Sequence, residues 1–359
     1  MSQGSQIDSQ TGGLGMRGRS RESTWLPRGG RFARTALLVL MLVPLALLAG
    51  SCGQSTKTLG VFQFGPDLDT ESAYRGLVAG LAEQGYTLGK NLHIERRDCG
   101  GDAATIESAA RAFAAAELDA VVPLTTPCLV AAAKYVKDKP VVFTSVYDPM
   151  AAGVAASPDE HPPNLTGVYS PPPVEQTIDL IMECLPEVAV IGTVYNPGEA
   201  NSSAAVEIME EYCAAKGIHL AKLMVRRPED VRSALEGFLG GRPQAGGPGN
   251  PQALYVTGDN TVMGVFDDVV AVTRRDKTPL FINDPGFVAQ GAVAGLGPDF
   301  GKAGRAGGRL LAEVLGGQDP ATTPLQLDAD TLLYVNRAAA AAVGAHVPQA
   351  VLERAARVF

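Results

Sequence analysis

Strand-length apolar runs alternate with helical stretches along most of this chain, and this alternation limits its fold more than any other feature. The first run, residues 59–64, is followed by a helical stretch at 71–84 that ends at Gly85. A strand, a helix and a glycine stop make one βα unit. Repetition of the unit predicts a parallel sheet with helices on both faces, because parallel strands need crossover connections between them.

The alternation occurs twice, with a break between the two series. Residues 150–173 contain six prolines and little periodicity, which indicates a crossing between two lobes. Before the break we predict strands 91–96, 120–124 and 140–144 and helices 103–116 and 128–137. After it we predict helices 174–185, 202–216, 228–239 and 260–273, strands 188–195, 218–224, 253–257 and 279–282, and a Gly/Pro-rich loop at 240–251.

The C-terminal part predicts a hinge rather than a third domain. It holds a strand at 292–296, a helix at 300–315 and a strand at 332–335. We expect residues 284–287 to return the chain to the first lobe and residues 319–327 to lead it back. The predicted fold class is α/β, with two Rossmann-like lobes and parallel sheets joined by a three-strand hinge. The expected domains are a signal peptide (1–51), a linker (52–58), an N-terminal lobe (59–164 plus 286–318) and a C-terminal lobe (165–285 plus 319–359).

The N-terminal segment predicts export and lipidation. Six arginines precede seventeen uncharged residues, 35–51, and Cys52 follows directly. A basic flank, a short apolar run and small residues at its exit are typical of a bacterial secretory signal, and Pro44 within so short a run disfavours a permanent membrane span. The segment resembles a lipoprotein signal, which implies cleavage before Cys52 and lipid on its thiol. Plain secretion and an uncut anchor are the alternatives.

Charge and cysteine content narrow the partners. Residues 1–51 hold six of the 30 basic and two of the 38 acidic residues, so the mature chain has a net charge of about −12. Such a charge argues against nucleic acid as a partner. The spacing of Cys99, Cys128, Cys184 and Cys213 predicts no metal site and no cofactor. Buried thiols are as consistent with the pattern as two disulfides, Cys99 with Cys128 and Cys184 with Cys213.

Polar loops follow several predicted strands, where parallel sheets gather their ligands. In the N-terminal lobe they contain Gln63, Phe64, Thr125, Thr126, Ser145, Tyr147 and Asp148. In the C-terminal lobe they contain Tyr195, Asn196, Glu199, Asn201, Ser202, Asp259, Asn260 and Asp284. Structural roles are open for several of them: Thr126 and either Asn201 or Ser202 suit helix N-caps, and Asp148 before Pro149 suits a turn.

An enzyme of the same fold class finds little support. No GxGxxG follows the first strand, and the chain has no P-loop and no GxSxG. The four histidines lie outside the polar loops. A ligand-sensing domain that presents its solute to a membrane receptor is the other alternative.

The loop at 195–202, Tyr-Asn-Pro-Gly-Glu-Ala-Asn-Ser, resembles the YNPGEANS signature of one group of ABC-transporter substrate-binding proteins. This group is akin to the tryptophan- and tyrosine-binding lipoproteins. Residues 164–168, 144–149 and 259–261 are similar to its NVTGV, FTAVTDP and DNTV stretches, and the resemblance extends over about 57–350. It implies a type I periplasmic-binding-protein fold, a periplasmic or otherwise extracytoplasmic location, and delivery of a small solute, associated with aromatic amino acids, to an ABC permease.

From this resemblance we expect a binding protein, not an enzyme, that closes its lobes on a zwitterionic amino acid. The carboxylate would meet Thr125, Thr126 and the N–H groups of the following helix, and Asp259 or Asp148 would face the ammonium group. Phe64, Tyr147 or Tyr195 would stack on an apolar side chain. The chain departs from the group at 65–69, where relatives have a His-Pro-Ala-Leu-Asp-like loop, and at Tyr147, where they have a small residue.

Overall fold

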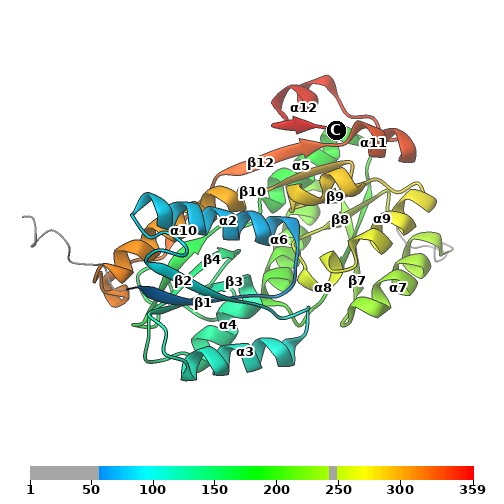
Figure 1. The fold of residues 1–359 in the computed structure, drawn as a ribbon. Coiled ribbons are helices and arrows are strands. Elements are labelled where there is room, and N and C mark those ends of the chain that lie inside the picture. The colour runs from blue at the N-terminus through cyan, green and yellow to red at the C-terminus, as the bar shows by residue number, and fades with distance from the viewer. Residues whose placement is uncertain (1–55, 242–248) are drawn as a thin grey trace, which may run out of the picture. The chain divides into compact units, whose positions relative to one another are not determined.

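The computed structural model describes residues 56–241 and 249–359 (Figure 1). The predicted signal peptide and Cys52 lie outside the described residues. None of the helices in the described ranges has the length and apolar character that a membrane span needs.

The N-terminal lobe is built on a six-stranded sheet with the order β11-β5-β4-β3-β1-β2. All its strand pairs are parallel. Strands β3 and β4 are buried along their whole length, as expected for strands covered on both faces. Its strands are β1 (Lys57–Gln63), β2 (Leu92–Asp98), β3 (Ala120–Leu124), β4 (Val141–Val146), β5 (Leu165–Tyr169) and β11 (Gln326–Leu327).

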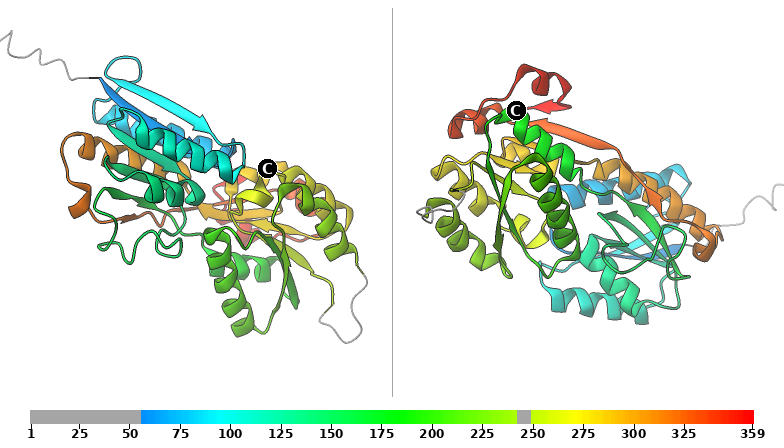
Figure 2. Two further views of the ribbon diagram at one scale, coloured as in Figure 1. Left: turned by 90° about the horizontal axis from the view of Figure 1, so that it is seen from below. Right: turned by 180° about the vertical axis from the view of Figure 1, so that it is seen from behind.

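Helices cover both faces of this sheet. Helices α2 (Leu68–Glu83) and α10 (Phe300–Leu315) pack together on one face, and α3 (Ala103–Ala115) and α4 (Thr126–Tyr135) pack on the other. Aspartate N-caps begin three of the four, because a side-chain carboxylate accepts a free N–H of the first turn: Asp67 for α2, Asp102 for α3 and Asp299 for α10. Figures 1 and 2 show α10, in orange, beside the blue helix α2.

The C-terminal lobe is built on a seven-stranded sheet with the order β13-β12-β10-β9-β8-β6-β7. Its one antiparallel pair is β10 with β12. The strands are β6 (Val190–Tyr195), β7 (His219–Met224), β8 (Ala253–Val256), β9 (Leu280–Ile282), β10 (Ala294–Pro298), β12 (Thr331–Val335) and β13 (Arg357–Val358). The helices are α5 (Val174–Cys184), α6 (Ala200–Lys216), α7 (Pro228–Gly240), α8 (Asn260–Met263), α9 (Phe266–Arg275), α11 (Arg337–Val343) and α12 (Gln349–Arg354), with the 3₁₀ turn η1 (Pro285–Gln290). A second 3₁₀ turn, η2 (Pro320–Thr322), belongs to the N-terminal lobe, where it precedes β11 and contacts β5.

The two-lobed α/β fold class predicted from the alternation is confirmed, but two crossings lie elsewhere than expected. Strand β5, placed in the C-terminal lobe by the boundary at residue 165, pairs with β4 and β11 of the N-terminal lobe. The chain does not return at 284–287, because β10 continues the C-terminal sheet beside β9. The crossings therefore follow β5, β10 and β11. Local periodicity identified β10 but missed β5, a five-residue strand inside the proline-rich break, and β11, which has two residues. It also carries no information about which sheet a strand joins.

Candidate ligand-binding site

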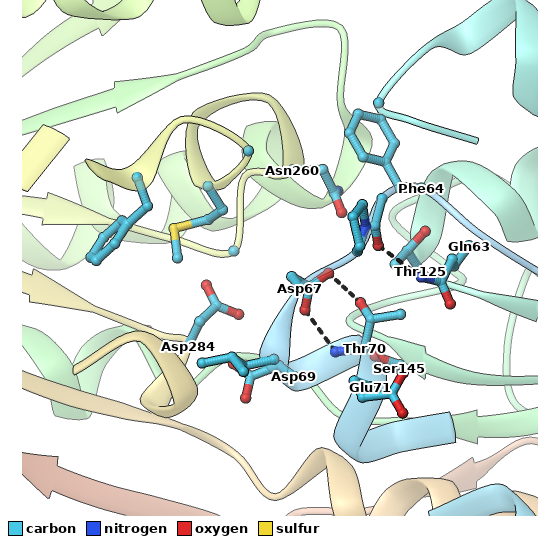
Figure 3. Close-up of a pocket in the computed structure, with 18 of the residues that line it drawn as sticks. Gln63, Phe64, Asp67, Asp69, Thr70, Glu71, Thr125, Ser145, Asn260 and Asp284 are labelled. Carbon is cyan, nitrogen blue, oxygen red and sulfur yellow. Dashed lines mark hydrogen bonds between the residues drawn. The ribbon is translucent and has the colours of Figure 1, made fainter. Parts of the chain in front are cut away.

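A cavity of about 1070 Å³ lies between the lobes, lined by residues of both. It is bounded by loops that follow the strands, as the strand-end argument predicts. Figure 3 shows its polar centre, where side chains of the N-terminal lobe approach the loop after β9. Nine residues predicted from the sequence line the cavity: Gln63, Phe64, Thr125, Thr126, Ser145, Tyr147, Asn201, Asn260 and Asp284. Their contact with a ligand stays a prediction.

Six predicted residues lie outside the cavity lining: Asp148, Tyr195, Asn196, Glu199, Ser202 and Asp259. Asp148 accepts hydrogen bonds from the N–H groups of Met150 and Ala151, which is the turn role weighed above. Tyr195 packs against the core of the C-terminal lobe. The other four connect two loops to each other.

The loop at 195–202 is joined to the loop after β8 through the buried carboxylate of Glu199. Its oxygens accept bonds from the backbone N–H groups of Asn260 (3.0 Å) and Thr261 (2.9 Å). They also accept from the Asn260 amide and the Thr261 hydroxyl, both at 2.6 Å. These are first-turn N–H groups of α8, so Glu199 caps a helix that is distant in sequence. A carboxylate with four donors is an unsuitable partner for a ligand ammonium group.

Asp259 completes this network from the other loop. It accepts from the N–H groups of Asn196 (2.6 Å) and Val262 (2.9 Å) and from the Ser202 hydroxyl (2.6 Å). Burial, with Glu199 nearby, raises the pKa of Asp259 above its usual range. Helix α6 begins at Ala200, so neither Asn201 nor Ser202 is its N-cap. Asn201 instead donates to the Gly258 carbonyl, and its buried Oδ1 has no hydrogen-bond partner among the described residues.

The N-terminal lobe offers donors to an anionic group at the start of α4. Thr125, which precedes the helix, makes no side-chain cap bond and has φ 85°, an unfavourable value for a β-branched residue. Its buried hydroxyl has no hydrogen-bond partner among the described residues. Ser145, at the end of β4, also has a positive φ, 58°. Backbone strain at two strand ends that face one cavity is a feature of binding sites.

Acceptors dominate the opposite part of the cavity, around Asp69 and Asp284. Tyr147 donates to Asp284 Oδ1 at 3.0 Å, and the Gly286 backbone lies against Asp69 Oδ1. The Oδ2 atoms of both aspartates are buried and have no partner among the described residues. Figure 3 shows the two side chains next to each other. Burial raises the pKa of Asp284, and burial together with Asp284 raises that of Asp69.

Sequence reasoning missed Asp69, which lies inside the first turn of α2 rather than directly after a strand. The available signal was the family loop itself, because the His-Pro-Ala-Leu-Asp-like pattern of relatives also has an aspartate at the position of Asp69. It also missed the apolar lining of Met263, Phe266, Phe287 and Phe300. Residues Met263 and Phe266 follow the Asp-Asn-Thr loop on short helices, and Tyr147 stacks on Phe300 with 6.0 Å between ring centroids and 17° between planes.

The one cationic side chain lining this cavity, Arg96, already has partners. It donates to Gln63 Oε1 (2.6 Å) and Glu71 Oε2 (2.7 Å) and lies over the ring of Tyr74. The Gln63 amide donates to the Gly65 carbonyl at 3.1 Å. These bonds hold the loop after β1, so Gln63 supports the cavity wall.

The four cysteines within the described residues are buried free thiols, so the alternative of two disulfides is not what the structure has. The nearby Cys128 thiol, in α4, lowers the pKa of Cys99.

A cleft between two α/β lobes, with unpaired hydrogen-bonding groups from both, defines a two-lobed solute-binding protein. The chain belongs to the ABC transporter substrate-binding protein family, whose sequence model matches residues 60–359. Its fold is the type I periplasmic-binding-protein fold that the resemblance implied. Members of this family work outside the cytoplasm and bind solutes rather than transform them.

Three relatives are informative. A tyrosine-binding protein of Clostridioides difficile (strain R20291) is 27% identical over 280 residues, which are 78% of this chain and 79% of the relative. A crystal structure of an ABC domain in complex with L-Trp from Streptococcus pneumonia is 28% identical with a TM-score of 0.79, covering 85% of this chain and all of that one. A ligand-free, open structure of a Clostridium difficile substrate-binding protein with adhesive properties is 26% identical with a TM-score of 0.63, covering 84% of this chain and 99% of that one.

Proposed function

We propose that this protein is an extracytoplasmic solute-binding lipoprotein of an ABC importer. It binds an amino acid, preferably an aromatic one, between its lobes and delivers it to a permease. The observation that carries the proposal is the division of the cavity into a donor side at Thr125 and an acceptor side at Asp69 and Asp284. An α-amino acid carries complementary groups on one carbon atom. No step of binding or release changes a covalent bond of the ligand.

The α-carboxylate is assigned to the N–H groups at the start of α4 and to the Thr125 hydroxyl, because a helix N-terminus favours an anion. The ammonium group is assigned to Asp69 and Asp284, in place of Asp259 and Asp148, whose carboxylates have other partners. The apolar side chain is assigned to the wall of Met263, Phe266 and Phe287. The relatives named for tyrosine and L-Trp support this choice.

Hinge closure accounts for uptake and release, because a ligand shifts the lobes toward the state that it binds more tightly. The greater likeness to the L-Trp complex than to the open relative, at similar identity, supports a nearly closed arrangement here. A lipid on Cys52 would hold the protein near its permease and raise the local concentration of loaded protein.

Titration calorimetry of the mature chain with each of the twenty amino acids tests the proposal. We expect heat of binding with aromatic amino acids and little with acidic ones. Trp25 is the single tryptophan and lies within residues 1–51, so indole fluorescence from a chain beginning at Cys52 reports only bound tryptophan. A flat response to all twenty would exclude amino-acid binding and leave the fold unaffected. Mass spectrometry of the mature N-terminus tests the lipid, and uptake of the identified ligand with and without this chain tests delivery.

A further inference from the structure

Two aspartates, one from each lobe, each contact the opposite lobe: Asp69 is half-buried and Asp284 is buried. Asp69 belongs to α2 of the N-terminal lobe, and its Oδ1 lies against the backbone of Gly286 in η1 of the C-terminal lobe, where an added Cβ would come within 2.4 Å of that oxygen. Asp284 follows β9 of the C-terminal lobe, and the Tyr147 hydroxyl that donates to it follows β4 of the N-terminal lobe. Each carboxylate thus has one oxygen in contact with the opposite lobe.

The second oxygen of each carboxylate is buried without a hydrogen-bond partner among the described residues. Asp284 is only 7% exposed. An ionised carboxylate in such a position is costly unless a cation or further donors compensate it. The charged groups around the pair do not compensate, since Asp67 and Asp299 are acidic too. Arg96, the cation that lines the cavity, is occupied by Gln63 and Glu71.

A primary ammonium group matches this pair in charge and size. It is a compact charge with three donors and needs acceptor-only oxygens, which two carboxylate Oδ2 atoms provide. A calcium ion would need six to eight oxygen ligands, and no group of three or more His, Cys, Asp or Glu side chains suited to a metal occurs in the described ranges. A guanidinium fork fits one bidentate carboxylate better than two separate oxygens.

We propose that Asp69 and Asp284 form a subsite for a primary ammonium group that the two lobes share, so that the ligand's cation, rather than its carboxylate, drives lobe closure. This inference rests on the proposed function, in which the cavity between the lobes is the ligand-binding site. It narrows the class of ligand to primary amines, with or without a carboxylate. Without a cation, closure requires the two carboxylates from opposite lobes to repel each other or to take up a proton, and with one they attract the same charge from both sides.

Three probes that differ in one group test the subsite in the wild-type mature chain: L-tyrosine, tyramine, which lacks the carboxylate, and 3-(4-hydroxyphenyl)propanoate, which lacks the amine. The tryptophan series is tested in parallel. Calorimetry measures affinity, and small-angle X-ray scattering measures closure as a decrease in radius of gyration. We expect the amines to bind and close the protein and the propanoates to do neither. Propanoates that bind and close the protein as well as the amino acids do would overturn the proposal.

Isosteric variants supply an independent arm. Asp69→Asn and Asp284→Asn should each lower amine affinity by about tenfold to a hundredfold, the effect of losing one charge-assisted bond. Asp148→Asn is the matched control, because its carboxylate caps a turn outside the cavity lining. In the absence of ligand, the variant that combines Asp69→Asn with Asp284→Asn should have a smaller radius of gyration at pH 8 than the wild type. An unchanged radius, with circular dichroism showing folded protein, contradicts the proposed repulsion.

The outcomes separate this inference from the proposed function. Binding of amino acids and propanoates alike would reject the shared ammonium subsite and retain amino-acid binding. If tyramine or tryptamine binds and no amino acid does, amino-acid binding is rejected and the ammonium subsite is retained.

Discussion

Acidic residues in similar loops have different roles, and their hydrogen-bond partners account for the difference. Glu199 and Asp259 each accept several bonds from the chain itself, whereas Asp69 and Asp284 each keep a buried oxygen unpaired. All four are acidic residues in or next to loops with Pro, Gly or Asn, so their local sequence does not separate them. The Glu199 partners are 61 and 62 positions away. Only the contact between loops shows which carboxylates are available to a ligand.

The titration of Asp284 predicts a pH dependence of stability. Burial, with Asp67 nearby, raises the pKa of Asp284 from 3.8 to about 7 against the opposing effect of the Tyr147 bond. Between these values the folded chain keeps a proton that the unfolded chain has lost, so stability falls as pH rises from about 4 to 7 and then levels. Asp284→Asn should reduce that slope by up to about 1.4 kcal/mol per pH unit.

Urea denaturation of both proteins at pH 5, 6, 7 and 8 measures the effect. The pKa of Asp259 is also raised to about 7, mainly by burial, so part of the slope should persist in the variant. Identical slopes in the two proteins would show that Asp284 is already ionised at pH 5 in the folded state.

At the scale of elements, α2 and α10 approach each other until their backbones touch. A Cβ at Gly304 would lie 2.1 Å from the Ala73 carbonyl oxygen, and one at Gly80 would lie 2.2 Å from that of Arg305. The sequence predicts a helix at 300–315. Nothing in the local sequence indicates which other helix the glycines of this helix contact. Close packing of this helix onto α2 brings its first residue, Phe300, into the cavity lining.

This contact predicts opposite outcomes for two helix-interior glycines. Gly304→Ala should destabilise the protein by about 1–3 kcal/mol, because α10 must move away from α2, and this cost exceeds the gain of about 1 kcal/mol in helix propensity. Gly237→Ala in α7 is the matched control, since a Cβ there meets nothing within 4 Å. It should gain up to about 1 kcal/mol. Chemical denaturation measures both, and equal stabilisation would mean that the two helices separate without cost.

At the scale of the whole molecule, Tyr147 reaches from the N-terminal lobe to Asp284 and the backbone of the other lobe. A Cβ at Gly258 would lie 2.0 Å from its hydroxyl oxygen, so this glycine permits the approach. The sequence marked Tyr147 as unusual for its family, but its partner is 137 positions away. The aromatic ring, the glycine and the aspartate become one feature only when the lobes meet.

Gly258→Ala should therefore hold the lobes apart. We expect a larger radius of gyration by X-ray scattering and weaker ligand affinity by about tenfold or more, since only the closed state makes contacts from both lobes. The double variant Gly258→Ala with Tyr147→Ala removes the obstructing ring and should restore the compact state. Failure of the second change to restore it would show that the alanine acts within its own loop, and a compact single variant would show that Tyr147 moves aside freely.

Local sequence was sufficient for the alternating elements, for two α/β lobes and for a binding cleft at the strand ends, because periodicity, capping and turn residues act over a few positions. Thr125 and Thr126 could be identified in the same way, since a strand end and a helix start adjoin there. The assignment of β5 and β10 to their sheets, the helix that α10 packs on and the pairing of Asp69 with Asp284 across the cleft followed only from the folded chain. These depend on contacts between residues far apart in sequence, and such contacts leave a buried, unpaired oxygen on each of these two carboxylates in the lining of the cavity.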